Sequence, residues 1–195
     1  MAITTDQVKE LRERTGISVM QCKRALEEAG GDMEKALVIL RKESSRAAEK
    51  KSDRELGAGV VQAYVHGGGD IGAMVLLSAE TDFVAKNKEF VDLAYNIAMH
   101  VAAANPRFLK REEVTDEDMK AAREVFEKEA AEKPAEMREK IVSGKMDSYL
   151  KDQVLLEQEY IKEPGRTIGF LLQEAVQKFG ERVELTSFVR FSARG

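Results

Sequence analysis

The sequence predicts an α+β protein: an N-terminal three-helix bundle, a linker helix, and a core in which helices pack on a small antiparallel sheet. Apolar residues recur every three or four positions in the first 42 residues, alternate after Gly57, and return to helical spacing from Asn87. These changes of period divide the chain into a three-helix docking module at residues 1–42, a basic linker helix at 43–56 and an α+β core at 57–195.

Glycines and capping residues divide the first module into three helices. The first helix is expected to end at Thr15-Gly16, because glycine suits the left-handed end of a helix. Ser18, with Gln21 three residues later, has the spacing of a capping box for the second helix. Asp32 is the expected N-cap of the third. The sides predicted to pack together carry Val8 and Leu11, then Cys22, Ala25, Leu26 and Ala29, then Met33, Ala36, Leu37 and Leu40.

The core begins with a predicted β-hairpin. Two runs rich in β-branched and apolar residues, 59–66 and 71–78, are separated by Gly67-Gly68-Gly69-Asp70, which supplies the positive φ angles of a tight connection. The remaining predicted elements are a helix from Asn87 that stops at Asn105-Pro106, a charge-dense helix at 115–151, an amphipathic helix at 168–179 that Gly180 ends, and a third strand at 183–191.

The composition describes a soluble, charge-rich globular protein. Hydrophobic residues make up 43% of the 195 residues and charged residues 34%, and no apolar run approaches the ~18 residues of a membrane span. The N-terminal stretch lacks the apolar segment of a signal peptide, and the single cysteine, Cys22, leaves no internal disulfide. A cytoplasmic location without membrane contact is therefore expected.

The charge balance argues against a dedicated nucleic-acid binder. The net charge is −4, whereas affinity for nucleic acid comes largely from a basic face that neutralises phosphates. Residues 41–54 are a local exception, since six basic residues there outnumber three acidic ones. We interpret this segment as a solvated helical linker, with contact to RNA or to an acidic partner as the alternative.

No motif indicates metal binding or catalysis. The two histidines, His66 and His100, lie 34 residues apart without a Cys or Glu at metal-ligand spacing. The triple glycine at 67–69 is not followed by the Gly-Lys-Ser/Thr of a phosphate loop, and Cys22 has no histidine near it in the sequence. The sequence therefore predicts a protein that is not an enzyme and holds no cofactor or metal.

Three stretches in combination carry a family likeness: VKELRERTGISVMQCKRALEEAGGDMEKA near the start, TDFVAK after the hairpin, and IAMHVAAANPRFL in the following helix. They resemble the N-terminal module, the core signature and the next helix of the bacterial elongation factor Ts family, and the likeness extends from Val8 to the closing FVRF. The resemblance implies nucleotide exchange on the translational GTPase elongation factor Tu, in its GDP-bound and nucleotide-free forms. It implies no catalytic residue and no cofactor in this chain.

The resemblance also implies which residues contact that partner. From the residues alone, Val19 and Met20 can be bundle core or surface, and His66 is by default an exposed strand end. The family's TDFV element is implied to dislocate Mg²⁺ from elongation factor Tu. The implied contacts are Thr81, Asp82, Phe83 and Val84 for Mg²⁺ dislocation, with Leu11, Val19, Met20 and His66 as further partner contacts.

The residues around Phe83 do not decide whether its side chain is buried or exposed. Glu80, Thr81 and Asp82 precede it and Lys86 follows soon after, so the residues alone leave burial and exposure equally open. The resemblance to the TDFV element favours an exposed wedge that enters an apolar pocket of the GTPase. His100, within an amphipathic helix, is interpreted as structural.

The single copy of the core predicts self-association. Longer members of the family resembled here carry a duplicated core, whereas hairpin and final strand occur once in this chain, and a sheet of about three strands leaves edges and an apolar face to cover. We therefore expect a homodimer with core paired to core. The alternative function is a pure interaction module, because residues 1–42 also resemble three-helix bundles of the ubiquitin-associated type.

Overall fold

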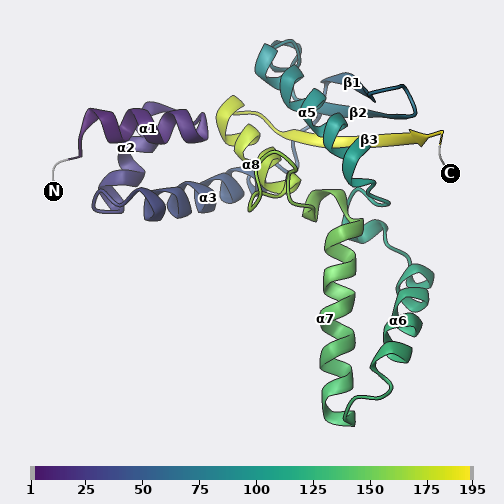
Figure 1. The fold of residues 1–195 in the computed structure, drawn as a ribbon. Coiled ribbons are helices and arrows are strands. Elements are labelled where there is room, and N and C mark those ends of the chain that lie inside the picture. The colour runs from purple at the N-terminus through teal and green to yellow at the C-terminus, as the bar shows by residue number, and fades with distance from the viewer. Residues whose placement is uncertain (1–2, 194–195) are drawn as a thin grey trace. The chain divides into compact units, whose positions relative to one another are not determined.

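The computed structural model describes residues 3–193, and of Ala135 only the backbone. The α+β class is confirmed, with a helical N-terminal region followed by a core that contains a three-stranded sheet (Figure 1). The elements are α1 (Thr5–Thr15), α2 (Val19–Glu28), α3 (Met33–Glu49), β1 (Ala58–His66), β2 (Ile71–Ala79), α4 (Asp82–Ala85), α5 (Lys88–Ala104), η1 (Arg111–Glu113), α6 (Asp116–Ala130), α7 (Ala135–Gln153), η2 (Leu155–Glu157), α8 (Ile168–Phe179) and β3 (Val183–Ser192).

The chain forms two compact units, and each contains part of the sheet. The first unit comprises Met1–Gln62, Val75–Asn96 and Phe170–Thr186, and the second comprises Ala63–Met74, Ile97–Gly169 and Ser187–Gly195.

None of the helices within residues 3–193 has the length and apolar character needed to cross a bilayer.

The second and third N-terminal helices begin after the predicted N-caps, and the first ends at the predicted Gly16. Gly16 adopts a left-handed φ of 67° and closes α1, and the Asp32 carboxylate accepts the Lys35 amide at 3.0 Å at the start of α3. The box predicted at Ser18 is only half formed, because the Gln21 side chain accepts the Ser18 hydroxyl instead of its backbone N–H. A complete box forms instead between Thr4 and Gln7.

The bundle core contains the residues predicted to face one another. Cys22 is among them, and burial raises the pKa of its thiol. The helix α3 runs without a break across residue 42, and near its end Ser45 donates a hydrogen bond to the Gln173 side chain of α8 at 2.7 Å. The division at residues 42 and 56 stays a prediction. The buried cluster is Val8, Leu11, Ile17, Cys22, Ala25, Leu26, Ala36 and Leu40.

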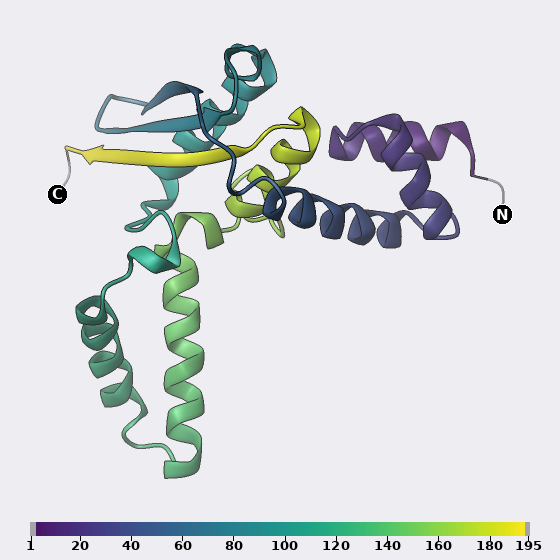
Figure 2. The ribbon, with the colours of Figure 1, turned by 180° about the vertical axis from the view of Figure 1, so that it is seen from behind.

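The sheet has the order β1-β2-β3, so β2 is the central strand (Figure 2). Gly67 and Gly69 in the β1–β2 connection take positive φ angles of 45° and 85°, as the hairpin prediction requires. Gly59 allows the hairpin strands to approach closely, since a Cβ there would lie 2.8 Å from the Leu77 carbonyl oxygen.

The prediction of one helix at residues 115–151 is wrong, because two helices, α6 and α7, form an antiparallel pair there (Figures 1 and 2). Pro134 explains the break: it lacks a backbone N–H and disfavours helical backbone at the residue before it. The pair has its own buried cluster of Ala130, Val142 and Met146, with Met119, Ala122, Phe126 and Ile141 packed against it.

Candidate functional site

The TDFV segment forms a single helical turn, α4, directly after the central strand. Phe83 is 84% exposed on this turn, whereas Val84 is 4% exposed and packs into the core. The Phe83 side chain therefore faces solvent, whereas the Val84 side chain faces the core. Val84 is the internal anchor of the turn and has almost no surface with which to contact another protein.

Polar bonds fix the backbone that leads into this turn. Thr81 donates both its amide and its hydroxyl to the Glu181 carboxylate, at 3.0 and 2.6 Å. Glu80 accepts the Arg182 amide at 2.5 Å and the Arg54 guanidinium at 3.1 Å. These bonds, first the Arg182 amide and then Arg54, hold the pKa of Glu80 below its usual value.

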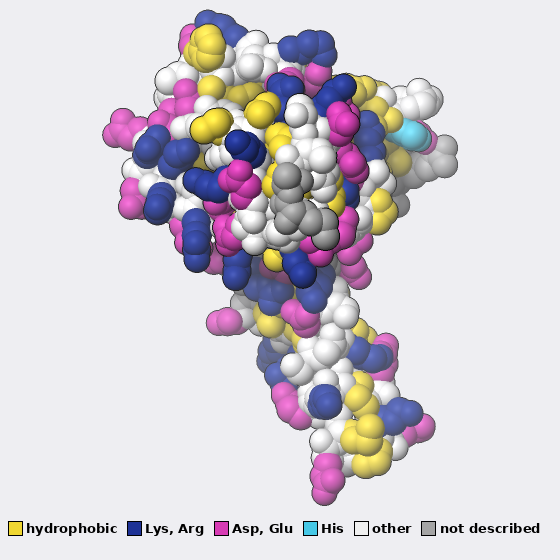
Figure 3. Space-filling view, turned by 90° about the vertical axis from the view of Figure 1, so that its left-hand side faces the viewer, with side chains coloured by type: hydrophobic (Ala, Val, Ile, Leu, Met, Phe, Trp, Pro, Cys, Tyr) yellow, Lys and Arg dark blue, Asp and Glu magenta, His cyan; other side chains and the backbone are white. Residues whose placement is uncertain are grey.

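The N-terminal module presents a second exposed apolar group. Val19 and Met20, at the first turn of α2, are 52% and 79% exposed. On the face of the molecule that Figure 3 shows, apolar side chains lie among charged ones. Leu11 is different, because it is completely buried in the bundle. Of the three residues implied as contacts here, only Val19 and Met20 have surface available to a partner.

His66 is exposed at the end of β1, as its default interpretation required. Its Nδ1 lies 2.9 Å from the hydroxyl oxygen of Tyr64, so the ring is oriented by a neighbour two residues away on the same strand. His66 and Phe83 belong to different compact units. The bond to Tyr64 holds the imidazole at the surface of its own unit.

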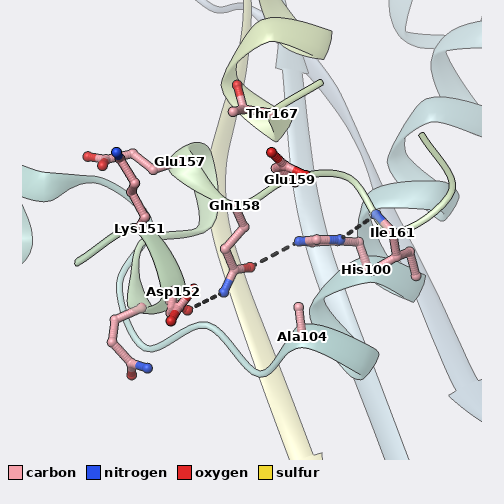
Figure 4. A pocket seen from close by; sticks show the side chains of 10 residues that line it. His100, Ala104, Lys151, Asp152, Glu157, Gln158, Glu159, Ile161 and Thr167 are labelled. Carbon is pink, nitrogen blue, oxygen red and sulfur yellow. Dashed lines mark hydrogen bonds between the residues drawn. The ribbon is translucent and has the colours of Figure 1, made fainter. Parts of the chain in front are cut away.

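His100 lies at the floor of a pocket in the second unit (Figure 4). Its side chain is completely buried, and its Nδ1 accepts the Ile161 amide at 3.4 Å. That acceptor role places the ring proton on Nε2, which donates to the Gln158 carbonyl oxygen at 3.0 Å. The Gln158 amide in turn donates to the Asp152 carbonyl at 2.6 Å. Both ring nitrogens of His100 therefore have hydrogen-bond partners when the imidazole is neutral.

The candidate site residues differ from one another in exposure, and the exposed ones include apolar side chains. Among the residues that the structure describes, no three His, Cys, Asp or Glu side chains come together as a possible set of metal ligands. The exposed phenyl ring on the α4 turn and the exposed apolar pair on α2 are both suited to contact with another protein.

Comparison with known proteins identifies the family. The sequence model of the family "Elongation factor TS" matches residues 42–194. The chain belongs to the elongation factor Ts family. It is 50% identical over 191 residues to elongation factor Ts of Carboxydothermus hydrogenoformans, an alignment that covers 97% of this chain and 88% of that protein.

Two further members of the elongation factor Ts family match over almost their full length. Elongation factor Ts of Thermodesulfovibrio yellowstonii is 45% identical, with 98% of this chain and 96% of that protein covered. The protein of the same name from Herpetosiphon aurantiacus is 45% identical, with 98% of each chain covered. Membership of the elongation factor Ts family places this chain in the elongation stage of protein synthesis.

Glu181 is a site residue that the sequence patterns do not reveal. This residue follows Gly180 in an ordinary charged segment and lies 100 positions after Thr81, the residue whose two donors it accepts. No spacing rule links residues so far apart, so the sequence of this elongation factor Ts family member carries no local signal for the contact.

The buried His100 makes stability depend on pH. Burial lowers its pKa from the ordinary 6.5, although the hydrogen bond to Gln158 acts in the opposite direction. Below about pH 6.5 the unfolded chain therefore binds a proton that the folded chain does not, and stability falls as the pH falls toward the lower folded pKa.

This dependence can be measured by urea unfolding at about pH 7.5 and about pH 5. His100→Gln should lose less stability between the two pH values than the parent does, whereas the surface variant His66→Gln should behave like the parent. An unchanged pH dependence in His100→Gln would contradict the assignment of a neutral buried imidazole.

Proposed function

We propose that this chain is a guanine-nucleotide exchange factor for elongation factor Tu, which promotes GDP release during polypeptide elongation in the cytoplasm. The observation that carries the proposal is the exposed Phe83 on a turn whose first residue is hydrogen-bonded to Glu181, in a chain of the elongation factor Ts family. The proposed activity needs no catalytic residue or cofactor of this chain's own.

Such a factor needs only a difference in affinity between the nucleotide-free and the nucleotide-bound forms of the GTPase. A GTPase holds its nucleotide through a phosphate loop and a Mg²⁺ that bridges phosphate oxygens. A partner accelerates release if it binds the nucleotide-free form more tightly than the nucleotide-bound form, and ~1.4 kcal/mol of this preference corresponds to about tenfold in affinity. An exposed apolar ring that is buried only in the displaced state provides such a preference.

The site residues divide this task between two surfaces. On the core, Phe83 enters an apolar pocket of the GTPase, and Asp82 contacts the partner beside it, so that the Mg²⁺ site is displaced. Thr81 and Val84 support the turn through Glu181 and the core. On the N-terminal module, Val19 and Met20 supply affinity, and Leu11, which is buried in the bundle, supports the module from within. We assign His66 to a further partner contact, because its ring is exposed and oriented.

Reciprocity separates exchange from simple binding. If the chain weakens GDP binding to elongation factor Tu by a given factor, GDP must weaken binding of the chain by the same factor. Titration calorimetry with nucleotide-free and GDP-loaded elongation factor Tu should show much weaker binding to the loaded form. Equal affinities for both forms would overturn exchange and support the alternative of a pure interaction module.

We further propose that the chain forms a homodimer through its core. In the second unit, Arg190 donates to the Ala102 carbonyl of α5 at 3.0 Å, so alternation along β3 directs its neighbours Val189 and Phe191 to the other side of the sheet. These two side chains, with Val65 of β1 and Met74 of β2, are exposed apolar residues. An uncovered apolar sheet face of this kind favours pairing with a second copy.

Sedimentation at micromolar concentration tests the dimer. The expected species has twice the 21.8 kDa mass of one chain, and Phe191→Ser should shift the equilibrium toward the monomer. The matched variant Val125→Ser, at an exposed apolar residue of α6, should remain dimeric. A parent that sediments only as a single chain would rule out the homodimer.

A further inference from the structure

The turn that carries Phe83 lacks the usual means of fixing a helix start. Thr81 is the N-cap of α4, yet its hydroxyl accepts no hydrogen bond from the backbone of the helix. The helix has only four residues, and a single isolated turn is unfavourable because few hydrogen bonds offset the ordering of its backbone. The ring of Phe83 is almost fully exposed and so contributes little to its own position. Its direction must therefore be set by contacts at Thr81 and below the turn.

Glu181 supplies the missing contact from a distant part of the sequence in the same compact unit. Its Oε1 accepts the Thr81 hydroxyl at 2.6 Å, and its Oε2 accepts the Thr81 amide at 3.0 Å. Two donors on one residue thus meet two oxygens of one carboxylate, which fixes both the position and the orientation of the backbone at Thr81. An ordinary serine or threonine cap satisfies a donor within its own helix and provides no such link to a distant segment of the chain.

A second carboxylate completes a reciprocal arrangement. Glu80 accepts the Arg182 amide at 2.5 Å, so the residue before Thr81 and the residue after Glu181 are also bonded. Each of the two chain segments therefore supplies one carboxylate that accepts a backbone N–H of the other. The Arg182 guanidinium also donates to the Arg54 carbonyl at 2.5 Å. Glu181 is the only one of these groups that the described structure bonds directly to the cap residue of α4.

We infer that Glu181 is a positioning residue for nucleotide exchange. Its two hydrogen bonds with Thr81 hold the α4 turn so that Phe83 has the orientation in which it enters the apolar pocket of the GTPase. This inference rests on the proposed exchange function. Glu181 itself need not touch the partner. Without Glu181 the turn samples several directions before binding, and ordering it when the ring enters its pocket costs free energy.

The test compares Glu181→Ala with Glu89→Ala. Glu89 is a matched control, since it is a carboxylate of the same unit whose side chain pairs with Lys178 at 2.8 Å and is not bonded to Thr81. At saturating factor, Glu181→Ala should slow release of labelled GDP from elongation factor Tu by about tenfold, the size expected for the loss of charge-assisted hydrogen bonds. Glu89→Ala should exchange like the parent. Equal rates for Glu181→Ala and the parent would overturn the inference.

A double variant shows whether Glu181 acts through the phenyl ring. If it does, Glu181→Ala should cause almost no further loss when Phe83 is already alanine, because there is no ring left to position. Losses that multiply in the double variant would show that Glu181 acts elsewhere, and would overturn the positioning role.

Amide hydrogen exchange of the free chain separates this inference from the proposed function, because it needs no GTPase. The Thr81 amide should exchange faster in Glu181→Ala than in the parent and Glu89→Ala, while amides of α5 stay protected in all three. Unchanged protection of Thr81 would overturn the inference even if the chain is an exchange factor. A parent that fails to speed GDP release would overturn the proposed function, and with it the role of Glu181 in exchange, even if the Thr81 amide responds to Glu181→Ala as expected. If Glu181→Ala does not fold, Glu181→Gln, which keeps the side-chain volume and one acceptor, carries the same readouts with smaller shifts.

Discussion

Phe83→Ala is expected to slow GDP release from elongation factor Tu by roughly 10- to 150-fold and to leave the chain's own melting temperature almost unchanged. The range follows from the ~1.5 to 3 kcal/mol gained when a phenylalanine side chain is buried. The side chain is 84% exposed in the free chain, so its truncation removes contacts that form only in the complex. Stopped-flow release of a fluorescent GDP and thermal unfolding measure the two effects separately.

Phe90→Ala is the matched control for this variant. Phe90 is completely buried and packs edge to face on Phe179 with ring centroids 5.8 Å apart. Its truncation should cost about 3 to 5 kcal/mol of stability. The same chemical change should therefore lower stability at Phe90 and slow GDP release at Phe83. An early unfolding of Phe83→Ala, or parental exchange by it, would contradict the wedge.

Replacement of both Val19 and Met20 by alanine is expected to weaken binding to elongation factor Tu by roughly 10- to 100-fold and to preserve the exchange rate at saturation. Both side chains are exposed on the first turn of α2, and burying a side chain of this kind contributes up to about 1.5 to 3 kcal/mol. Calorimetric titration gives the affinity, and the plateau of the release rate gives the exchange step.

Val38→Ala controls for the loss of any exposed apolar residue in the same module. Val38 is 56% exposed on α3 and lies outside the proposed surface, so its variant should bind like the parent. A double variant at Val19 and Met20 that binds normally would remove the N-terminal module from the account. One that binds normally but exchanges slowly would reverse the proposed division of labour.

The features that the sequence predicts well are those set by local chemistry. Gly16, Asn105 and Gly180 end their helices in left-handed backbone, and the glycines of the hairpin take positive φ angles, because these conformations follow from residue type and position in the chain. The charge pattern of residues 115–151 predicts one helix, but Pro134, which lacks a backbone N–H, divides the segment into two.

The candidate site was only partly predictable. The TDFV resemblance located the turn, but the neighbours Phe83 and Val84 differ in exposure because the core lies on one side of the turn only. Leu11 was implied as a contact and is buried for the same reason. The bond between Thr81 and Glu181 depends on the tertiary fold, which brings together residues 100 positions apart. Local sequence patterns carry no information about such a pair.

The most direct test of the central claim is the rate at which labelled GDP leaves elongation factor Tu as the concentration of this chain is raised. If the chain is an exchange factor, the release rate increases with its concentration and reaches a plateau well above the spontaneous rate. Excess unlabelled GDP prevents rebinding of the label. A release rate that stays at the spontaneous value, under conditions in which the two proteins bind, would contradict the account.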